Sequence, residues 1–156
     1  MQIRERIKTR LGKKIVEWQE VSARRIYFTV KKEDLFEVAK LLFKDLGLRF
    51  SIASGTDTPN AFEILYHFTF DATGEFYSVR VLLEDKKDPQ VDSLTPIFPA
   101  AEWIEREIWE MLGIKFTGHP NLKRLLLAED WPEGDYPLRI KNEGRDKREE
   151  GKNNVA

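Results

Sequence analysis

Two runs of alternating apolar and polar residues, FEILYHFTF and EFYSVRVLL, flank the short loop DATG. The two-residue period predicts two strands, each with one apolar and one polar face. Pairing Phe70 with Glu75 across the loop places Tyr66 opposite Val79, so the apolar residues of both runs share one face. The two runs therefore predict an antiparallel hairpin buried on one side, which requires helices or a second sheet to cover it.

Three other segments carry the helical period and end at a glycine: residues 3–11, 32–46 and 100–112. Shorter strands are predicted at 15–22, 25–30 and 48–52, the last with Leu48, Phe50 and Ile52 alternating. GTDTPN has the composition of a turn, and EDKKDPQVDSLTPIFP predicts a loop of about fourteen residues, a length that is often functional or partner-bound.

The order of these elements predicts an α+β fold with two layers, a mostly antiparallel or mixed sheet packed with helices on one face. We place this domain at 1–113, followed by an extended docking segment at 114–139. Residues 140–156 are almost devoid of apolar side chains and predict a polar tail that is disordered or ordered by a partner.

Composition excludes several kinds of function. With 26 basic and 27 acidic residues the net charge is −1, which gives no field that would attract nucleic acid. The absence of cysteine excludes disulfides, a cysteine nucleophile and thiolate-held iron–sulfur clusters in this chain, and two histidines are few for a zinc site. No apolar run approaches the roughly 20 residues of a membrane span, so we expect a soluble cytoplasmic chain able to dock on a membrane complex.

The helix predicted at 100–112 has an unusual distribution of charge. Its inward stripe comprises Ile104, Ile108, Met111 and Leu112, and its opposite face comprises Glu102, Arg106 and Glu110. Glu107 lies beside the stripe, where a carboxylate would be partly desolvated. It is either a general acid with a raised pKa or a paired structural carboxylate, and the second is favoured because ion-pair networks also perturb pKa values.

A second candidate for chemistry is His119, whose backbone is restricted by Gly118 and Pro120. A stand-alone acid/base enzyme would combine it with Glu107 and Asp130, but no nucleophile motif or paired-histidine spacing accompanies it. His67, on the polar face of the hairpin, is expected to be an exposed or interfacial strand residue.

Aromatic residues are concentrated near the C-terminal end of the sequence. Trp103, Trp109, Phe116, Trp131 and Tyr136 fall within about 35 residues, together with several prolines. A place in the core explains Trp103, whereas Trp109 lies away from the inward stripe and one chain would not bury it fully. Aromatic side chains with arginine and little regular structure are typical of a protein interface, so this segment predicts a docking element.

The segment EREIWEMLGIKFTGHPNLKRLLLAEDW followed by YPLR resembles the signature of the 30-kDa subunit of respiratory complex I. The matching positions are Glu105, Arg106, Glu107, Glu110, Gly113, Ile114, Phe116, Gly118, His119, Pro120, Leu122, Arg124, Asp130, Trp131, Pro137, Leu138 and Arg139. The resemblance implies a subunit without its own cofactor that packs on the large 49-kDa or hydrogenase-like catalytic subunit, beside small iron–sulfur subunits. Iron–sulfur clusters, and in hydrogenases a [NiFe] centre, would belong to those partners.

The same resemblance implies a non-catalytic, peripheral subunit on the cytoplasmic side of the membrane, in a complex that translocates ions. After Arg139 the sequence IKNE departs from the continuation common in respiratory members, which favours a membrane-bound [NiFe] hydrogenase or archaeal-type dehydrogenase over a conventional NADH:quinone oxidoreductase. Charged hydrogen bonds would lock the segment or its interface. The expected docking residues are Trp103, Glu105, Arg106, Glu107, Trp109, Glu110, Phe116, Gly118, His119, Pro120, Arg124, Asp130, Trp131, Pro137 and Arg139.

Overall fold

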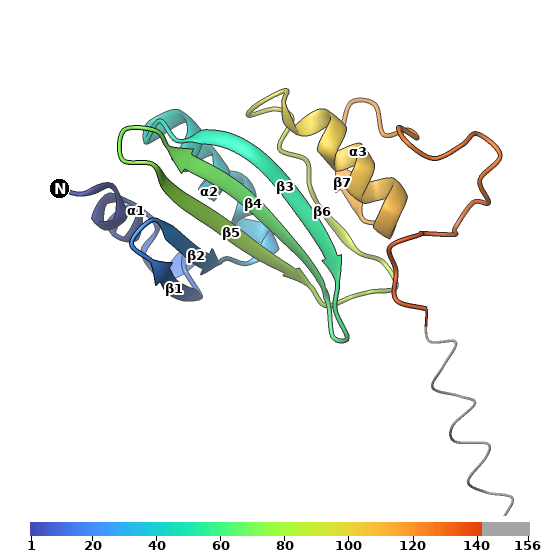
Figure 1. Cartoon of the computed structure of the whole chain (residues 1–156), viewed down its shortest axis with the longest axis horizontal. Coiled ribbons are helices and arrows are strands. Elements are labelled where there is room, and N and C mark those ends of the chain that lie inside the picture. Colours follow the sequence, from blue (N-terminus) through green and yellow to red (C-terminus); the bar gives the residue numbers. More distant parts are fainter. Residues whose placement is uncertain (142–156) are drawn as a thin grey trace, which may run out of the picture.

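The hairpin lies inside a five-stranded sheet in the computed structural model, which describes residues 1–141 (Figure 1). The helical elements are α1 (Ile3–Leu11), η1 (Gly12–Lys14), η2 (Lys32–Asp34), α2 (Leu35–Lys40), η3 (Leu41–Asp45) and α3 (Ala101–Leu112). The strands are β1 (Glu17–Ser22), β2 (Arg25–Thr29), β3 (Arg49–Asp57), β4 (Phe62–Phe70), β5 (Glu75–Leu83), β6 (Gln90–Asp92) and β7 (Lys115–Thr117).

The sheet has the order β1-β2-β5-β4-β3 and is mixed, because β2 and β5 run parallel while the other pairs are antiparallel. The predicted register of the hairpin is confirmed: Phe70 pairs with Glu75 and Tyr66 with Val79. β6 and β7 form a separate two-stranded parallel sheet. The predicted α+β class is thus confirmed, in its mixed-sheet form.

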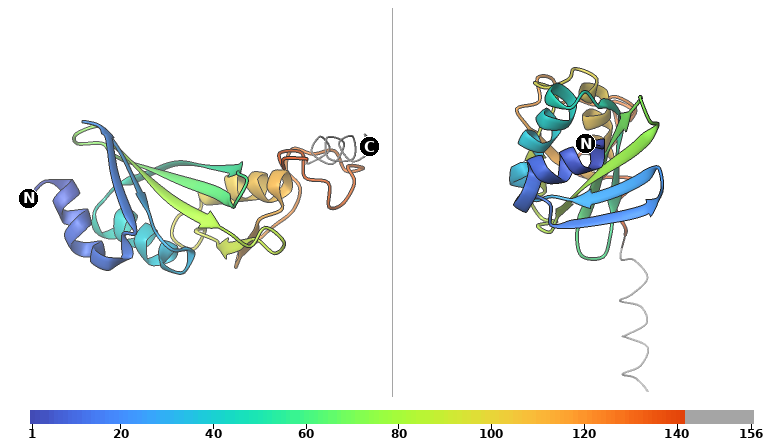
Figure 2. Two further views of the ribbon diagram at one scale, coloured as in Figure 1. Left: turned by 90° about the horizontal axis from the view of Figure 1, so that it is seen from below. Right: turned by 90° about the vertical axis from the view of Figure 1, so that its left-hand side faces the viewer.

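One face of the five-stranded sheet carries the core. α1 and α2 pack on that face, and α3 packs against it at β3 (Figure 2). The opposite face is polar, as the alternation predicts. There His67 Nδ1 lies 2.8 Å from Ser78 Oγ, and burial lowers the pKa of the histidine. Within residues 1–141, no helix is long and apolar enough to cross a bilayer.

Several local expectations were wrong. β3 does not alternate simply, because a bulge between Phe50 and Ile52 shifts the register and leaves Ile52 49% exposed. Half of the predicted turn GTDTPN belongs to β3, and the chain reverses only after Asp57. The predicted helix at 32–46 is composite, with a 3₁₀ start and a π-helical end. The long loop contains β6, and its Leu94 and Phe98 are buried in the core.

The closest approach of α3 to the sheet occurs at Gly55. A Cβ atom added there would lie 2.8 Å from Leu112 Cδ1 and 3.1 Å from Ile108 Cγ2. We therefore expect Gly55→Val to lower the free energy of unfolding by roughly 2 kcal/mol through overpacking, measured by denaturant titration. Ser54→Val, one residue earlier on the exposed face, is the matched control, and an equal loss in both variants would contradict the packing explanation.

Candidate partner-docking site

Three charged side chains of α3 are buried, which the helical pattern did not predict. Glu105, Arg106 and Glu110 are 0%, 7% and 3% exposed. Arg106 and Glu110 lie opposite the inward stripe, and this face is covered by the irregular chain that follows β7. We call residues 118–141 the strap (Figure 1).

Arg106 and Glu110 hold the strap through its backbone. Arg106 donates from Nε to Lys123 O at 2.9 Å and from Nη2 to Arg124 O at 2.6 Å. The Glu110 carboxylate accepts three consecutive N–H groups, from Leu125, Leu126 and Leu127, at 3.0, 2.7 and 3.3 Å. A segment without helix or sheet partners needs such acceptors and donors, because buried peptide groups without them are costly.

Two further arginines close the strap on itself and on the helix end. Arg124 Nη1 donates to Ala128 O at 2.7 Å and to Glu129 O at 3.1 Å. Arg139 Nε donates to Leu112 O at 2.7 Å, which satisfies a carbonyl at the end of α3. The Arg139 guanidinium also lies 4.5 Å from the ring centroid of Tyr136. Charge-assisted hydrogen bonds therefore fasten the strap along its length.

Gly113 is required at the point where the strap returns to α3. Its φ is 74°, in the left-handed region that ends many helices. A Cβ atom there would also lie 2.5 Å from the Tyr136 ring and 2.6 Å from Arg139 Nη2. Both the backbone conformation and the contact with the strap exclude a larger residue.

Glu105 points to the other side, into a polar site between α3 and the chain after β6. Ser93 Oγ donates to Glu105 Oε2 at 2.6 Å, and Leu94 N–H donates to Oε1 at 2.7 Å. Burial raises the pKa of Glu105 to about 7, and these two donors oppose the rise. The carboxyl group therefore changes charge near neutral pH.

His119 lies against this site with a fully buried side chain. Its Nε2 is 2.9 Å from Glu102 O and 3.9 Å from Glu105 Oε2. Asn121 N–H donates to Nδ1 at 3.0 Å, so Nδ1 accepts and Nε2–H donates to the Glu102 carbonyl. Both ring nitrogens are thus engaged by backbone groups, which anchors the start of the strap.

The three residues of the acid/base alternative are not brought together. Glu107 faces β3 beside Ser54 and Gly55, whereas His119 packs at Glu102 on another side of α3. Asp130 is exposed in the strap, and neither its side chain nor that of Glu107 forms a hydrogen bond within the described residues. The carboxyl group with the raised pKa is Glu105, two residues from the one we expected. Residues 1–141 also contain no cluster of side chains able to hold a metal ion.

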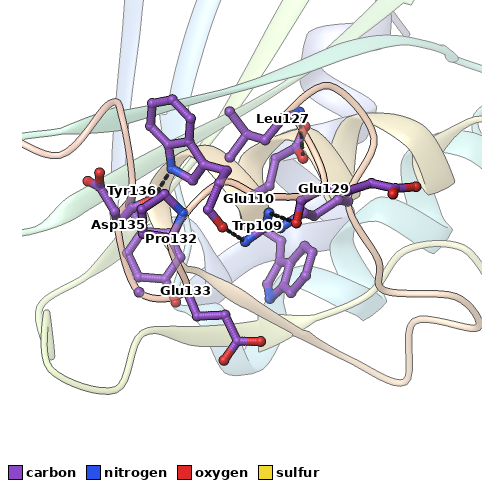
Figure 3. Close-up of a pocket in the computed structure, with 11 residues that line it drawn as sticks. Trp109, Glu110, Leu127, Glu129, Pro132, Glu133, Asp135 and Tyr136 are labelled. Carbon is purple, nitrogen blue, oxygen red and sulfur yellow. Dashed lines mark hydrogen bonds between the residues drawn. The ribbon is translucent and has the colours of Figure 1, made fainter.

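The predicted aromatic residues divide between core and surface. Phe116 is 3% exposed in β7 and belongs to the core, so it is not available for docking. Trp103, for which a core position was sufficient explanation, is instead 68% exposed, because neither the sheet nor the strap covers its side of α3. Trp109 is half-buried as expected and lines a pocket with Trp131 and Tyr136 (Figure 3).

The strap leaves apolar side chains in solvent that sequence reasoning missed. Leu126, Leu138 and Ile140 are 61%, 57% and 57% exposed. The run Leu125 to Leu127 was the available signal, since three consecutive leucines fit no amphipathic period. Gly118 and Pro120 are also exposed and Pro137 is half-buried. The surface beside α3 thus combines an ordered backbone with unpaired apolar side chains, as docking surfaces do.

Residues 28–148 match the protein family described as "Respiratory-chain NADH dehydrogenase, 30 Kd subunit". The chain belongs to this family. A Nocardioides protein named as the C-type subunit of NADH-quinone oxidoreductase is 36% identical over 124 residues, which are 72% of this chain and 49% of the relative. A Bacteroides fragilis protein named as the C/D-type subunit of the same enzyme is 34% identical over 110 residues, 62% of this chain and 21% of that protein. The chain therefore spans about half the length, or less, of these two relatives.

The fold of this family member also occurs in a solved complex. One chain of the archaeal membrane-bound sulfane sulfur reductase, a respiratory membrane complex, superposes with a TM-score of 0.80 over 99% of this chain and 91% of that chain. The sequence identity is 19%, so the likeness shows a shared fold.

Proposed function

We propose that this chain is a non-catalytic structural subunit in the peripheral arm of a membrane-bound, complex-I-related oxidoreductase, docked on the large catalytic subunit. The observation that carries the proposal is the fastening of the strap. Arg106 and Glu110, two buried charges, bind five backbone groups of an irregular segment and so hold exposed apolar residues in one conformation. A preordered surface of this kind loses little conformational entropy on binding.

The names of the relatives favour an NADH-quinone oxidoreductase over the hydrogenase or archaeal-type dehydrogenase that the sequence after Arg139 suggested. The relative whose name joins the letters C and D supports a close association of this type of chain with a second subunit. In this proposal the redox cofactors, iron–sulfur clusters included, belong to neighbouring subunits. The chain itself keeps those subunits at fixed distances.

Docking through the strap predicts a large effect of Leu126→Glu, because the new charge would be desolvated at the interface. We expect a tagged full-length variant purified from native membranes to recover about tenfold less of the partner subunits than the unchanged chain. The melting temperature of the purified variant chain should be unchanged, since Leu126 is exposed.

Val16→Glu is the matched control: Val16 is also 61% exposed but precedes β1, at the end of the molecule away from the strap (Figure 1). It should recover partners normally. Mass spectrometry and metal analysis of the unchanged preparation test the proposal as a whole. Recovery of the chain from native membranes without iron–sulfur or other redox subunits would overturn it.

A further inference from the structure

The strap encloses a pocket of about 460 Å³ against one side of α3 (Figure 3). Its aromatic walls are Trp109, Trp131 and Tyr136, and its rim carries Glu129, Glu133 and Asp135. In Figure 3 the Glu133 carboxylate and the Trp109 indole both project into the lower half of the view. None of the contacts described for the strap explains why aromatic and acidic side chains should be gathered here.

The pocket is built before any ligand arrives. Trp131 Nε1 donates to Asp135 O at 2.8 Å, which closes the turn that carries the rim. Arg124, which also lines the pocket, is held by the carbonyls of Ala128, Glu129 and Trp131. Its charge is thus spent on the backbone of the strap.

The rim carries negative charge that the described residues leave unneutralised. Glu129 and Glu133 are exposed and form no ion pair within residues 1–141. Asp135 meets only Lys141, at 3.8 Å and on the surface, an interaction of little strength. Aromatic faces beside unpaired carboxylates attract a cation, by the ring quadrupoles and by direct charge.

We propose that this pocket receives an arginine side chain of the subunit on which the strap docks, an inference that rests on the proposed function. A guanidinium group suits the site better than an ammonium group, because it stacks on aromatic faces and donates to two carboxylates at once. The chain already uses this arrangement once: the guanidinium of Arg139 lies 5.0 Å from the Phe62 ring centroid and 4.5 Å from that of Tyr136.

The test uses the isolated full-length chain and a small probe, N-acetyl-arginine amide, followed by the indole N–H signals in NMR. We expect the probe to shift the signals of Trp109 and Trp131 but not those of Trp18 and Trp103, which lie outside the pocket. The neutral citrulline analogue should leave all four signals in place. The lysine analogue should bind several-fold more weakly.

Two substitutions sharpen the result. Glu133→Gln should weaken probe binding about fivefold, whereas Asp130→Asn, which removes a charge from the same run without lining the pocket, should change it less than twofold. Equal shifts with citrulline, equal binding of the lysine analogue, or no shift at all would each overturn the proposal. The probe needs no partner, so this failure is distinct from failure of the docking function, which the recovery of redox subunits tests.

Discussion

Replacing Glu110 with alanine should release the middle of the strap while leaving the sheet and α1 intact. The variant removes the acceptor of three consecutive N–H groups, those of Leu125, Leu126 and Leu127. A hydrogen bond to a charged acceptor is worth roughly 1.5–3 kcal/mol, but the freed amides regain part of this from water. We expect a net local loss of about 3 kcal/mol, equivalent to about 100-fold faster hydrogen exchange at these amides.

Hydrogen exchange resolved by residue measures this effect directly. Glu102→Ala is the control on the same helix, because the Glu102 side chain forms no hydrogen bond among the described residues. Glu110→Gln should give an intermediate result, since an amide retains one acceptor oxygen in place of two. Unchanged protection at all three leucine amides in Glu110→Ala would show that the strap is held by other contacts.

The second large effect concerns pH. Burial holds the pKa of Glu105 at about 7 in the folded chain, against an ordinary value of 4.5. Between these values the unfolded chain has lost the proton and the folded chain keeps it, so the free energy of unfolding falls as pH rises from 4.5 to 7 and is level above. The difference of 2.5 pKa units corresponds to a loss of roughly 3 kcal/mol.

The measurement is the free energy of unfolding of the chain minus that of Glu105→Gln, taken by denaturant titration from pH 4 to 8. The subtraction removes the opposite trend expected from His67, whose pKa is lowered by burial. Ser93→Ala should extend the fall to higher pH, because it removes a donor that stabilises the ionised carboxylate. A difference that does not vary with pH would mean that Glu105 ionises normally in the folded chain.

These two predictions separate the roles of the buried charges on α3. Within the described residues, the hydrogen bonds of the Glu110 and Arg106 side chains all go to the strap, so their removal loosens the candidate interface. Glu105 instead bonds to Ser93 and Leu94, which belong to the chain before α3. The helix is therefore fastened on two sides, and the strap can be weakened without dismantling the site that holds Glu105.

Local pattern was sufficient for the framework of the fold. The register of β4 with β5 followed from two runs of alternating residues and the length of one loop, and the end of α3 from Gly113. It was insufficient where the chain departs from regular geometry. The bulge in β3 and the π-helical turn after Lys40 change which residues are buried, and neither has a periodic signal.

The candidate site was predictable in its residues but not in its arrangement. The family signature marked Arg106, Glu110, Arg124 and Arg139, all of which bond to backbone groups of the strap or of the end of α3. It also marked Glu107 and Asp130, which make no such contact within residues 1–141. A signature records which positions matter and is silent on which atoms they meet.

The sequence by itself determined the elements, because helix and strand periods arise from local backbone geometry. Only the tertiary structure decided which face of α3 is interior. The helical period separates Ile108 from Arg106, but it does not say that the strap covers Arg106 while Trp103 stays in solvent. The physical reason is that an irregular segment is positioned by hydrogen bonds to side chains far from it in sequence. Their energy depends on the folded arrangement as a whole.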